Sequence, residues 1–285
     1  SLKQLNLIGN VLESCAKNGV KRFLDLNSST GYPDIRRPLT EDEYWVDEPY
    51  KSYYGYGWMR RYREKLMEHV SRFSGLEIAL ARCTAIFGPY DNFDLKTCHV
   101  VPALIKRHLS GENPFVIWGT PDVVRDFLYV KDVVNGALLI LEKGESMRPY
   151  NLGYGGGITI GEIVDSILKV TGETPKVEYD VTKPTTIPFR AVSIDRIKNE
   201  LGFNPTYTFE NFLEGDSNRL ARNASIAVAN KPGGTSFNPL LIFGGVGLGK
   251  THLAHAIGVD IKDKYPEKTV LYISAEKFTQ QYIES

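Results

Sequence analysis

The chain of 285 residues is long enough for one or two domains, and its 42% hydrophobic, 24% charged and 11% aromatic residues are typical of a soluble globular protein. Lysine plus arginine and aspartate plus glutamate number 34 each, so the zero net charge argues against a surface built mainly to bind nucleic acid or an anionic membrane. Three cysteines without a C-x-x-C pair, no apolar run of membrane-spanning length and no secretory pattern predict a reduced, cytoplasmic protein that contacts no membrane and has no structural metal.

The first predicted elements are a helix and a strand. Leu5, Ile8 and Leu12 recur at helical spacing before Gly19, and residues 21–27, KRFLDLN, are typical of a buried strand. A parallel sheet needs a strand before its first crossover helix, so we expect an earlier part of this fold to lie outside the sequence.

Strands and helices continue to alternate up to about residue 209. The strand-like runs are FLDLN, EIALARC and FVIWG, and the helical runs are YREKLMEHVSRFS, VVPALIKRHLSG, VVNGALLILEKG and IGEIVDSILKVTG. This alternation predicts an α/β fold in which helices pack on a parallel sheet.

Five stretches of this first segment carry a family resemblance. They read NVLESCAKNGVKRFLDLNSSTGYP, YYGYGWMRRYREKL, FGPYDNFDLKTCHVVPALIKR, IWGTPDVVRDFLYVKDV and YNLGYGGGITIGEIVDSI. Together they resemble the extended short-chain dehydrogenase/reductases, the NAD-dependent epimerases and dehydratases of nucleotide sugars, and among these the GDP-fucose synthases. The resemblance implies an incomplete Rossmann-like parallel sheet with a small substrate domain, NAD or NADP as cofactor, and a nucleotide sugar, in first place a GDP-sugar, as substrate.

The resemblance also implies a catalytic hydroxyl and a tyrosine that acts as acid and base, with a cation nearby that favours the ionised phenol and holds the nicotinamide ribose. Tyr53, Tyr54 and Tyr56 compete for the tyrosine position. Tyr56 is selected because it has a cation, Arg60, one helical turn further on. Ser28 corresponds to the hydroxyl, and its alternative interpretation is a serine in a turn.

Three further positions match residues of the GDP-fucose synthases. His99 matches the histidine that those enzymes use for epimerisation, whereas Thr30 stands where they carry a cysteine, so we expect a reductase or an epimerase of one position. Arg125 matches a substrate-binding residue and suits a diphosphate, because a guanidinium group bonds two phosphate oxygens at once. Trp118 matches as well, with core packing as its equally weighted alternative.

Two departures from the family reduce the expected activity. Arg60 replaces a lysine at the ribose-binding position, and a planar guanidinium is no equivalent of an ammonium group there. The glycine-rich loop that holds the dinucleotide pyrophosphate in this family is not found before Ser28. We therefore expect weak activity or none.

The second segment contains a phosphate loop. FNPLLIFGGVGLGKTHLAHAIG predicts a strand, a glycine-rich loop and a helix, and VLYIS predicts a further strand, so that the segment is a partial P-loop unit of strand, loop, helix and strand. The loop satisfies G-x-x-x-x-G-K-[ST] in full. The expected ATP-binding residues of the loop are Gly244, Gly245, Val246, Gly247, Leu248, Gly249, Lys250 and Thr251. Lys250 would reach the β- and γ-phosphates and Thr251 would bind Mg²⁺, whereas His252 and His255 are expected to pack rather than bind metal.

Residues around the loop carry a second resemblance. YTFENFLEGDSNRLARNASIAVANKPG and KTVLYISAEKFTQQYIES resemble the start of the AAA+ domain of the bacterial replication initiator DnaA. The resemblance implies that Phe212 and Asn218 border the adenine. Because it stops before the acidic strand, the sensors and the DNA-binding domain of that family, we expect neither ATP hydrolysis nor DNA binding.

The chain is therefore expected to be a chimera, with a truncated epimerase/reductase-like domain over 1–206, a truncated P-loop segment over 207–285, and a crossover at Asn204 to Phe212. The expected function is an epimerase/reductase-like domain fused to an ATP-binding fragment. Three alternatives stay open: an ATP-binding protein resembling a replication initiator, an active oxidoreductase with an ATP-binding tail, and a permuted domain in which the P-loop unit docks on the open sheet edge. A homodimer is also left open.

Overall fold

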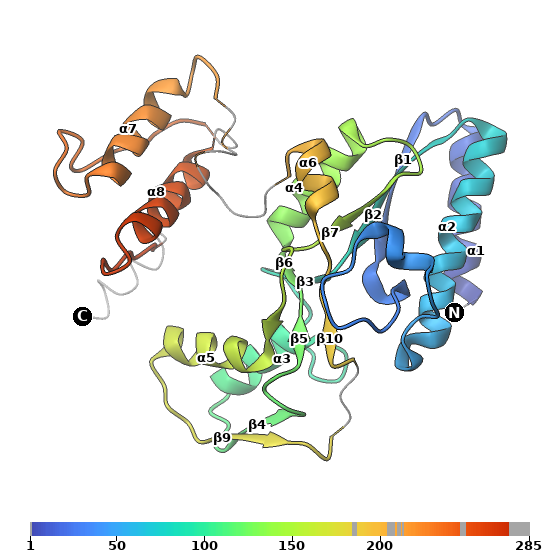
Figure 1. Ribbon diagram of the computed structural model, residues 1–285, viewed down its shortest axis with the longest axis horizontal. Helices are drawn as coiled ribbons and strands as arrows, with labels where there is room; N and C mark the ends of the chain where they lie inside the picture. Colours follow the sequence, from blue (N-terminus) through green and yellow to red (C-terminus); the bar gives the residue numbers. More distant parts are fainter. Residues whose placement is uncertain are drawn as a thin grey trace. The chain divides into compact units, whose positions relative to one another are not determined.

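A computed structural model of the chain describes residues 2–183, 187–203, 209, 212, 214–245 and 249–273 (Figure 1). The chain divides into two compact units, residues 1–205 and 206–285. The predicted crossover, Asn204 to Phe212, lies outside the described residues except for Phe209 and Phe212. None of the described helices is both long and apolar enough to cross a bilayer.

The first unit alternates strands and helices as predicted. In chain order its elements are α1 (Leu2–Lys17), β1 (Arg22–Ser28), η1 (Ser29–Gly31), η2 (Glu41–Trp45), η3 (Lys51–Tyr53), α2 (Tyr54–Ser74), β2 (Glu77–Cys83), β3 (Ala85–Phe87), α3 (Val100–Leu109), β4 (Phe115–Trp118), β5 (Val124–Arg125), β6 (Phe127–Tyr129), α4 (Val130–Lys143), β7 (Pro149–Leu152), β8 (Ile158–Thr159), α5 (Ile160–Thr171), β9 (Val177–Asp180), β10 (Phe189–Arg190) and α6 (Asp195–Leu201).

The centre of this unit is a parallel sheet of order β1-β2-β7. In Figure 1, α1 and α2 lie on one side of this sheet and α4 and α6 on the other. Ile78 and Leu80 of β2 pack in a core with residues of α1 and α2, whereas Ala79 and Ala81 pack in a second core with residues of α4. A strand buried on both faces reads as a nearly continuous apolar run, as β2 does.

The smaller part of the unit is built from short strands and two helices. β5 pairs with β10 in parallel and with β8 in antiparallel fashion, β4 pairs with β9, and β3 pairs with β6. Apolar residues of α3, β4 and α5 form its core. The predicted α/β class, with parallel strands and a small additional domain, is confirmed.

One edge of the central sheet is open. Within the part of the chain that the structure describes, β1 pairs with β2 alone. Leu26 of β1 is exposed at 45%, so the face of the strand on which it lies is only partly covered there. The edge carries unpaired backbone groups that another strand could extend.

A buried ion pair joins α2 to β2. The guanidinium group of Arg82 donates from Nε to Oε1 of Glu64 at 2.9 Å and from Nη2 to Oε2 at 2.8 Å, and the two side chains are only 2% and 5% exposed. Asn27 of β1 donates to the same carboxylate at 2.8 Å, and Arg82 also donates to the carbonyl of Glu41 at 2.7 Å. The bidentate geometry offsets the desolvation of both charges.

The second unit has a small core between its helices α7 (Arg219–Asn230) and α8 (Lys250–Lys264). Strands were expected before and after the phosphate loop, but residues 239–243 and 269–273, all of them described, form none. Leu241 and Phe243 are 81% and 88% exposed. A buried parallel strand needs neighbours that supply hydrogen bonds and cover both faces, and the described residues of this unit supply neither.

Replacing Glu64 by glutamine should lower the free energy of unfolding of the first unit by about 3 kcal/mol, because Arg82 is left buried without its counter-charge. The matched control is Glu68→Gln on the same helix, which loses an exposed pair with Lys65 and Arg72 and should cost less than about 1 kcal/mol. Urea unfolding followed by tryptophan fluorescence measures both, since Trp45, Trp58 and Trp118 all lie in the first unit. Equal losses would contradict a structural role for the buried pair.

Candidate functional site

A cleft of about 1230 Å³ opens at the carboxyl ends of β1 and β2. Ligands of parallel α/β sheets bind at this edge, where the loops that follow neighbouring strands meet. The cleft is lined by all six residues that the sequence assigned to the first unit's site, namely Ser28, Tyr56, Arg60, His99, Trp118 and Arg125.

Tyr56 and Arg60 project from one face of α2. Nη2 of Arg60 donates a hydrogen bond to the Tyr56 hydroxyl, and the guanidinium carbon lies 4.8 Å from the centre of the tyrosine ring. Of the competing tyrosines, Tyr53 also lines the cleft, whereas Tyr54 does not and instead packs against Trp58 with ring centres 6.4 Å apart. The structure therefore brings together the tyrosine and the cation that the spacing selected.

Ser28 serves the turn that follows β1 as well as the cleft. Its hydroxyl oxygen caps the short helix η1 and accepts hydrogen bonds from the backbone N–H of Thr30 at 3.2 Å and from the Thr30 hydroxyl at 3.1 Å. Thr30 and His99 lie on the same cleft, and His99 is exposed at the start of α3. Ser28 therefore both caps a turn and lines the cleft.

Trp118 ends β4 and is 59% exposed. Core packing, the alternative weighed for this side chain, does not account for that exposure. The ammonium group of Lys183 lies 5.9 Å from the ring centre. An exposed indole at a cleft wall offers a flat surface for a planar or apolar ligand group.

Arg125 has a neighbour that sequence reasoning missed. In the parallel pair of β5 with β10, Arg125 stands directly opposite Arg190, and both line the cleft. Arg190 donates to the carbonyls of Tyr32 and Pro33, each at 3.1 Å, and no ion pair of Arg190 is found among the described residues. No signal in the sequence could have joined the two arginines, because their pairing depends on two strands of two residues each.

Burial acts on both guanidinium groups. It lowers the pKa of Arg125, and it lowers the pKa of Arg190 to about 10, with the charge of Arg125 as a further cause. Two like charges held in register are unfavourable unless an anion lies between or beside them. The arrangement can therefore take a ligand with two neighbouring anionic groups, such as a diphosphate.

In the second unit the described part of the phosphate loop is Gly244, Gly245 and 249–251, while Val246, Gly247 and Leu248 lie outside the described residues. The Lys250 ammonium group donates to the carbonyls of Gly244 at 2.9 Å and Gly245 at 2.6 Å. Gly249 precedes α8 with a φ of 83°, and Thr251 is exposed in the first turn of that helix. The lysine is thus held above the loop at the N-terminus of a helix, where anions bind.

Phe212 and Asn218 take different places. The Phe212 ring is buried against the loop's end, since a Cβ on Gly249 would lie 2.6 Å from its Cε2, and the ring packs on His252 with centres 5.1 Å apart. Asn218 precedes α7 and its side-chain oxygen accepts a hydrogen bond from the backbone N–H of Gly215 at 2.8 Å.

His255 packs on a tyrosine ring with centres 4.1 Å apart. Among the described residues no group of three or more His, Cys, Asp or Glu side chains could hold a metal ion.

Two family models match the chain. The model of the NAD dependent epimerase/dehydratase family matches residues 3–153, more than half of the chain, and the model of the bacterial DnaA ATPase domain matches residues 203–285. These matches confirm the two family resemblances found in the sequence.

Relatives of known name include the chromosomal replication initiator protein DnaA of Flavobacterium psychrophilum, 78% identical over 98 residues, and that of Bacteroides thetaiotaomicron, 57% identical over 82 residues. The matches cover 34% and 29% of this chain. The chain spans only 20% and 17% of the length of these two relatives.

Solved structures resemble the first unit. UDP-glucose 4-epimerase from Thermotoga maritima aligns with a TM-score of 0.62 and 27% identity over 70% of this chain and 63% of that chain. A GDP-L-fucose synthetase from Naegleria fowleri aligns with a TM-score of 0.61 and 25% identity over 70% of this chain and 66% of that chain.

The chain thus spans slightly less than two thirds of the length of each of these two structures. The chain belongs to the NAD-dependent epimerase/dehydratase family, and it joins to that family's fold a part of the bacterial DnaA ATPase domain.

Proposed function

We propose that the first unit binds a nucleotide sugar, with a GDP-sugar first among candidates, and that the second unit binds ATP with Mg²⁺, while turnover in either unit is weak or absent. The observation that carries the first part is the pair Arg125 and Arg190, held opposite each other in one cleft. A nucleoside diphosphate has two adjacent anionic groups, and each guanidinium group can donate hydrogen bonds to one of them.

Other cleft residues fit the rest of such a ligand. The cleft is large enough for a nucleotide sugar, and Trp118 presents an exposed ring at its wall. The solved relatives are named as a UDP-glucose 4-epimerase with UDP-glucose and as a GDP-L-fucose synthetase, so both bases belong among the candidates.

The proton chemistry proposed for this site rests on Tyr56. Its hydroxyl oxygen accepts from Arg60, which leaves the tyrosine O–H directed to another acceptor, and a sugar oxygen in the cleft would be that acceptor. Ser28 and His99 line the same cleft and would orient the sugar hydroxyls. Thr30 is a poor proton shuttle, in agreement with a reductase or an epimerase of one position.

The family implies NAD or NADP, and one structural neighbour, a UDP-glucuronic acid 4-epimerase from Bacillus cereus, is named in complex with NAD. In residues 2–28 of this chain the only glycines are Gly9, inside α1, and Gly19, just after it. Neither stands where a strand turns into a helix, so these described residues do not fit a dinucleotide pyrophosphate. No hydride step is assigned to these residues. The weak turnover proposed for the first unit is supported by Arg60, a guanidinium group where the family resemblance implies a lysine.

ATP binding by the second unit is supported by the complete loop sequence and by the position of Lys250. Its ammonium group now binds two loop carbonyls, which phosphate oxygens would replace, and the exposed Thr251 hydroxyl would bind Mg²⁺. The buried Phe212 ring packs closely against Gly249 at the start of α8. The proposed contact of Asn218 with the adenine rests on the family resemblance alone.

Replacing Arg125 or Arg190 by glutamine should weaken the binding of GDP or UDP by about tenfold or more, since each loses a charge-assisted phosphate contact. Isothermal titration of the 285-residue chain measures the change. Arg148→Gln is the matched control, because this arginine pairs with Glu200 away from the cleft and should bind as wild type does. Unchanged affinity in both cleft variants with an intact fold would contradict the diphosphate site.

Replacing Lys250 by alanine should weaken ATP–Mg²⁺ binding by about tenfold or more, because the phosphates lose their principal cation. Lys262→Ala provides the control, since this lysine of the same helix donates to the carbonyls of Pro266 and Lys268 at the far end. Titration with ATP and Mg²⁺ should separate the two variants. If Lys250→Ala bound ATP as tightly as Lys262→Ala, the loop would not be the ATP site, and the nucleotide-sugar site would be untouched by that result.

A further inference from the structure

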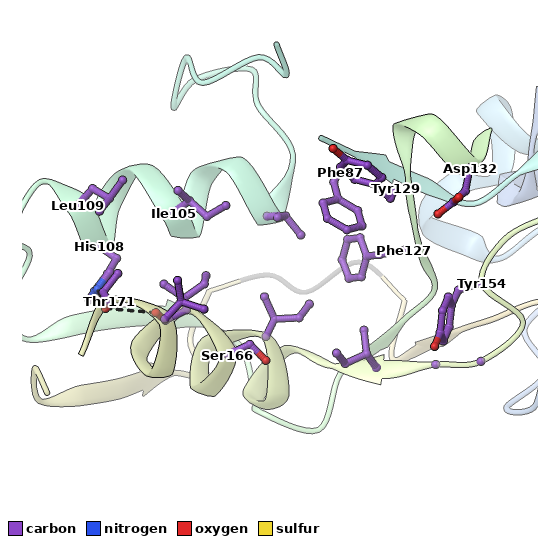
Figure 2. Close-up of a pocket in the computed structure, with 17 residues that line it drawn as sticks. Phe87, Ile105, His108, Leu109, Phe127, Tyr129, Asp132, Tyr154, Ser166 and Thr171 are labelled. Atoms are coloured by element: carbon purple, nitrogen blue, oxygen red, sulfur yellow. Dashed lines mark hydrogen bonds between the residues drawn. The ribbon is translucent and has the colours of Figure 1, made fainter. Parts of the chain in front are cut away.

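A second pocket, of about 790 Å³, lies between α3 and α5 (Figure 2). Phe87, Val101 and Phe127 line both this pocket and the cleft, so the two cavities share an aromatic and aliphatic wall. The other lining side chains come mainly from the facing sides of the two helices and are mostly apolar. None of the six residues predicted for the first unit's site lines this pocket.

Asp132 is the feature that the apolar lining does not explain. It lines the pocket from the first turn of α4, it is only 8% exposed, and no hydrogen bond or ion pair of its carboxylate is found among the described residues. In Figure 2 its carboxylate oxygen points toward the pocket. Burial raises the pKa of Asp132 to about 6, so at neutral pH it carries a negative charge without a partner other than the helix N-terminus.

At the opposite end of the pocket the polar side chain already has polar partners. His108 lies there with Nε2 at 2.8 Å from the Thr171 hydroxyl and at 3.3 Å from a carboxylate oxygen of Glu173. Figure 2 shows His108 and Thr171 at one end and Asp132 and Tyr154 at the other. A ligand that fills the pocket would therefore meet its charged partner only at the Asp132 end.

Aromatic rings accompany the carboxylate. Phe87 packs on Tyr129 with ring centres 5.7 Å apart and on Phe127 at 6.4 Å, and all three line the pocket, as does Tyr154. The negative faces of aromatic rings attract organic cations, and they do so most strongly where water is excluded. A buried carboxylate beside several aromatic rings selects a cation over a neutral or anionic group.

We propose that this pocket binds an apolar organic cation, with its ammonium group at Asp132 and the aromatic side chains, and its apolar body between α3 and α5. An anionic ligand would be repelled by the carboxylate, and a neutral one would leave the carboxylate buried without compensation. A purely structural Asp132, which only stabilises the N-terminus of α4, would give the pocket no preference for charge.

Three matched probes test this site: naphthylmethylamine, naphthylmethanol and naphthoic acid, which share one ring system and differ in charge. Each is titrated calorimetrically into the 285-residue chain at pH about 7.5, where both the amine and Asp132 are charged. The amine should bind about tenfold or more tightly than the alcohol, and the acid should bind most weakly. Equal affinity of amine and alcohol, or no binding of the amine at millimolar concentration, would overturn the proposal.

Substitutions in the pocket test whether the preference for the amine arises at Asp132. Asp132→Asn should remove the preference for the amine and leave the alcohol within about threefold of its wild-type affinity, whereas Asp165→Asn, on the exposed side of α5, should leave the preference intact. Ile105→Trp, which fills the pocket from α3, should weaken all three probes together. If Asp132→Asn kept the amine preference, or if Ile105→Trp left the amine bound, the cation would bind elsewhere and the proposal would fail. Binding of GDP to the same variants, measured separately, shows whether the neighbouring cleft is still folded.

Discussion

The ion pair between Glu64 and Arg82 is the interaction on which the geometry of the first unit depends. Both side chains are almost fully buried. A rotation of α2 about its axis would separate the pair and leave one charge buried without its partner, at a cost of several kcal/mol. Tyr56, Arg60 and Glu64 are spaced one helical turn apart and share a face of α2. The pair therefore also sets the direction in which the tyrosine and the cation enter the cleft. Asn27, which donates to the same carboxylate, ties this arrangement to the end of β1.

The cleft is formed where this locked part of the fold meets the short strands of the smaller part. β5 and β10 contribute two residues each, yet their register sets Arg125 opposite Arg190. Backbone carbonyls of Tyr32 and Pro33 hold the Arg190 guanidinium in place without neutralising its charge. A positive charge that is buried, oriented by carbonyls and in no ion pair with a described residue is costly to the fold alone, and an anionic ligand would offset this cost.

The long amphipathic helices and the central strands could be predicted because their periodicity is local and uninterrupted. The six residues that line the cleft could be named together because their order along the chain carried a family resemblance. Arg190 was not predicted, because it stands opposite Arg125 only through the pairing of two strands that lie 65 residues apart in the sequence. The prediction of strands around the phosphate loop was wrong for a related reason. The apolar run that contains Leu241 and Phe243 has the composition of a buried strand, but a strand forms only where neighbouring strands pair with it and other residues cover it. Trp118 could not be decided from sequence at all, since the same residue type at a strand end serves a core or a cleft.

In the functions proposed for them, both units bind phosphate, but by different physical means. In the first unit the proposed phosphate partners are side chains from separate strands, so a single substitution can remove a contact and the site depends on the packing of the whole unit. In the second unit the proposed partners are backbone N–H groups at the start of α8 together with one side chain, Lys250, and they lie within one short segment of the chain. Each unit has hydrophobic clusters built only from its own residues, so a bound ligand stabilises the unit that binds it by mass action. A site assembled from distant strands is sensitive to the stability of its unit, whereas a loop that opens a helix needs only that helix and the residues that pack on it.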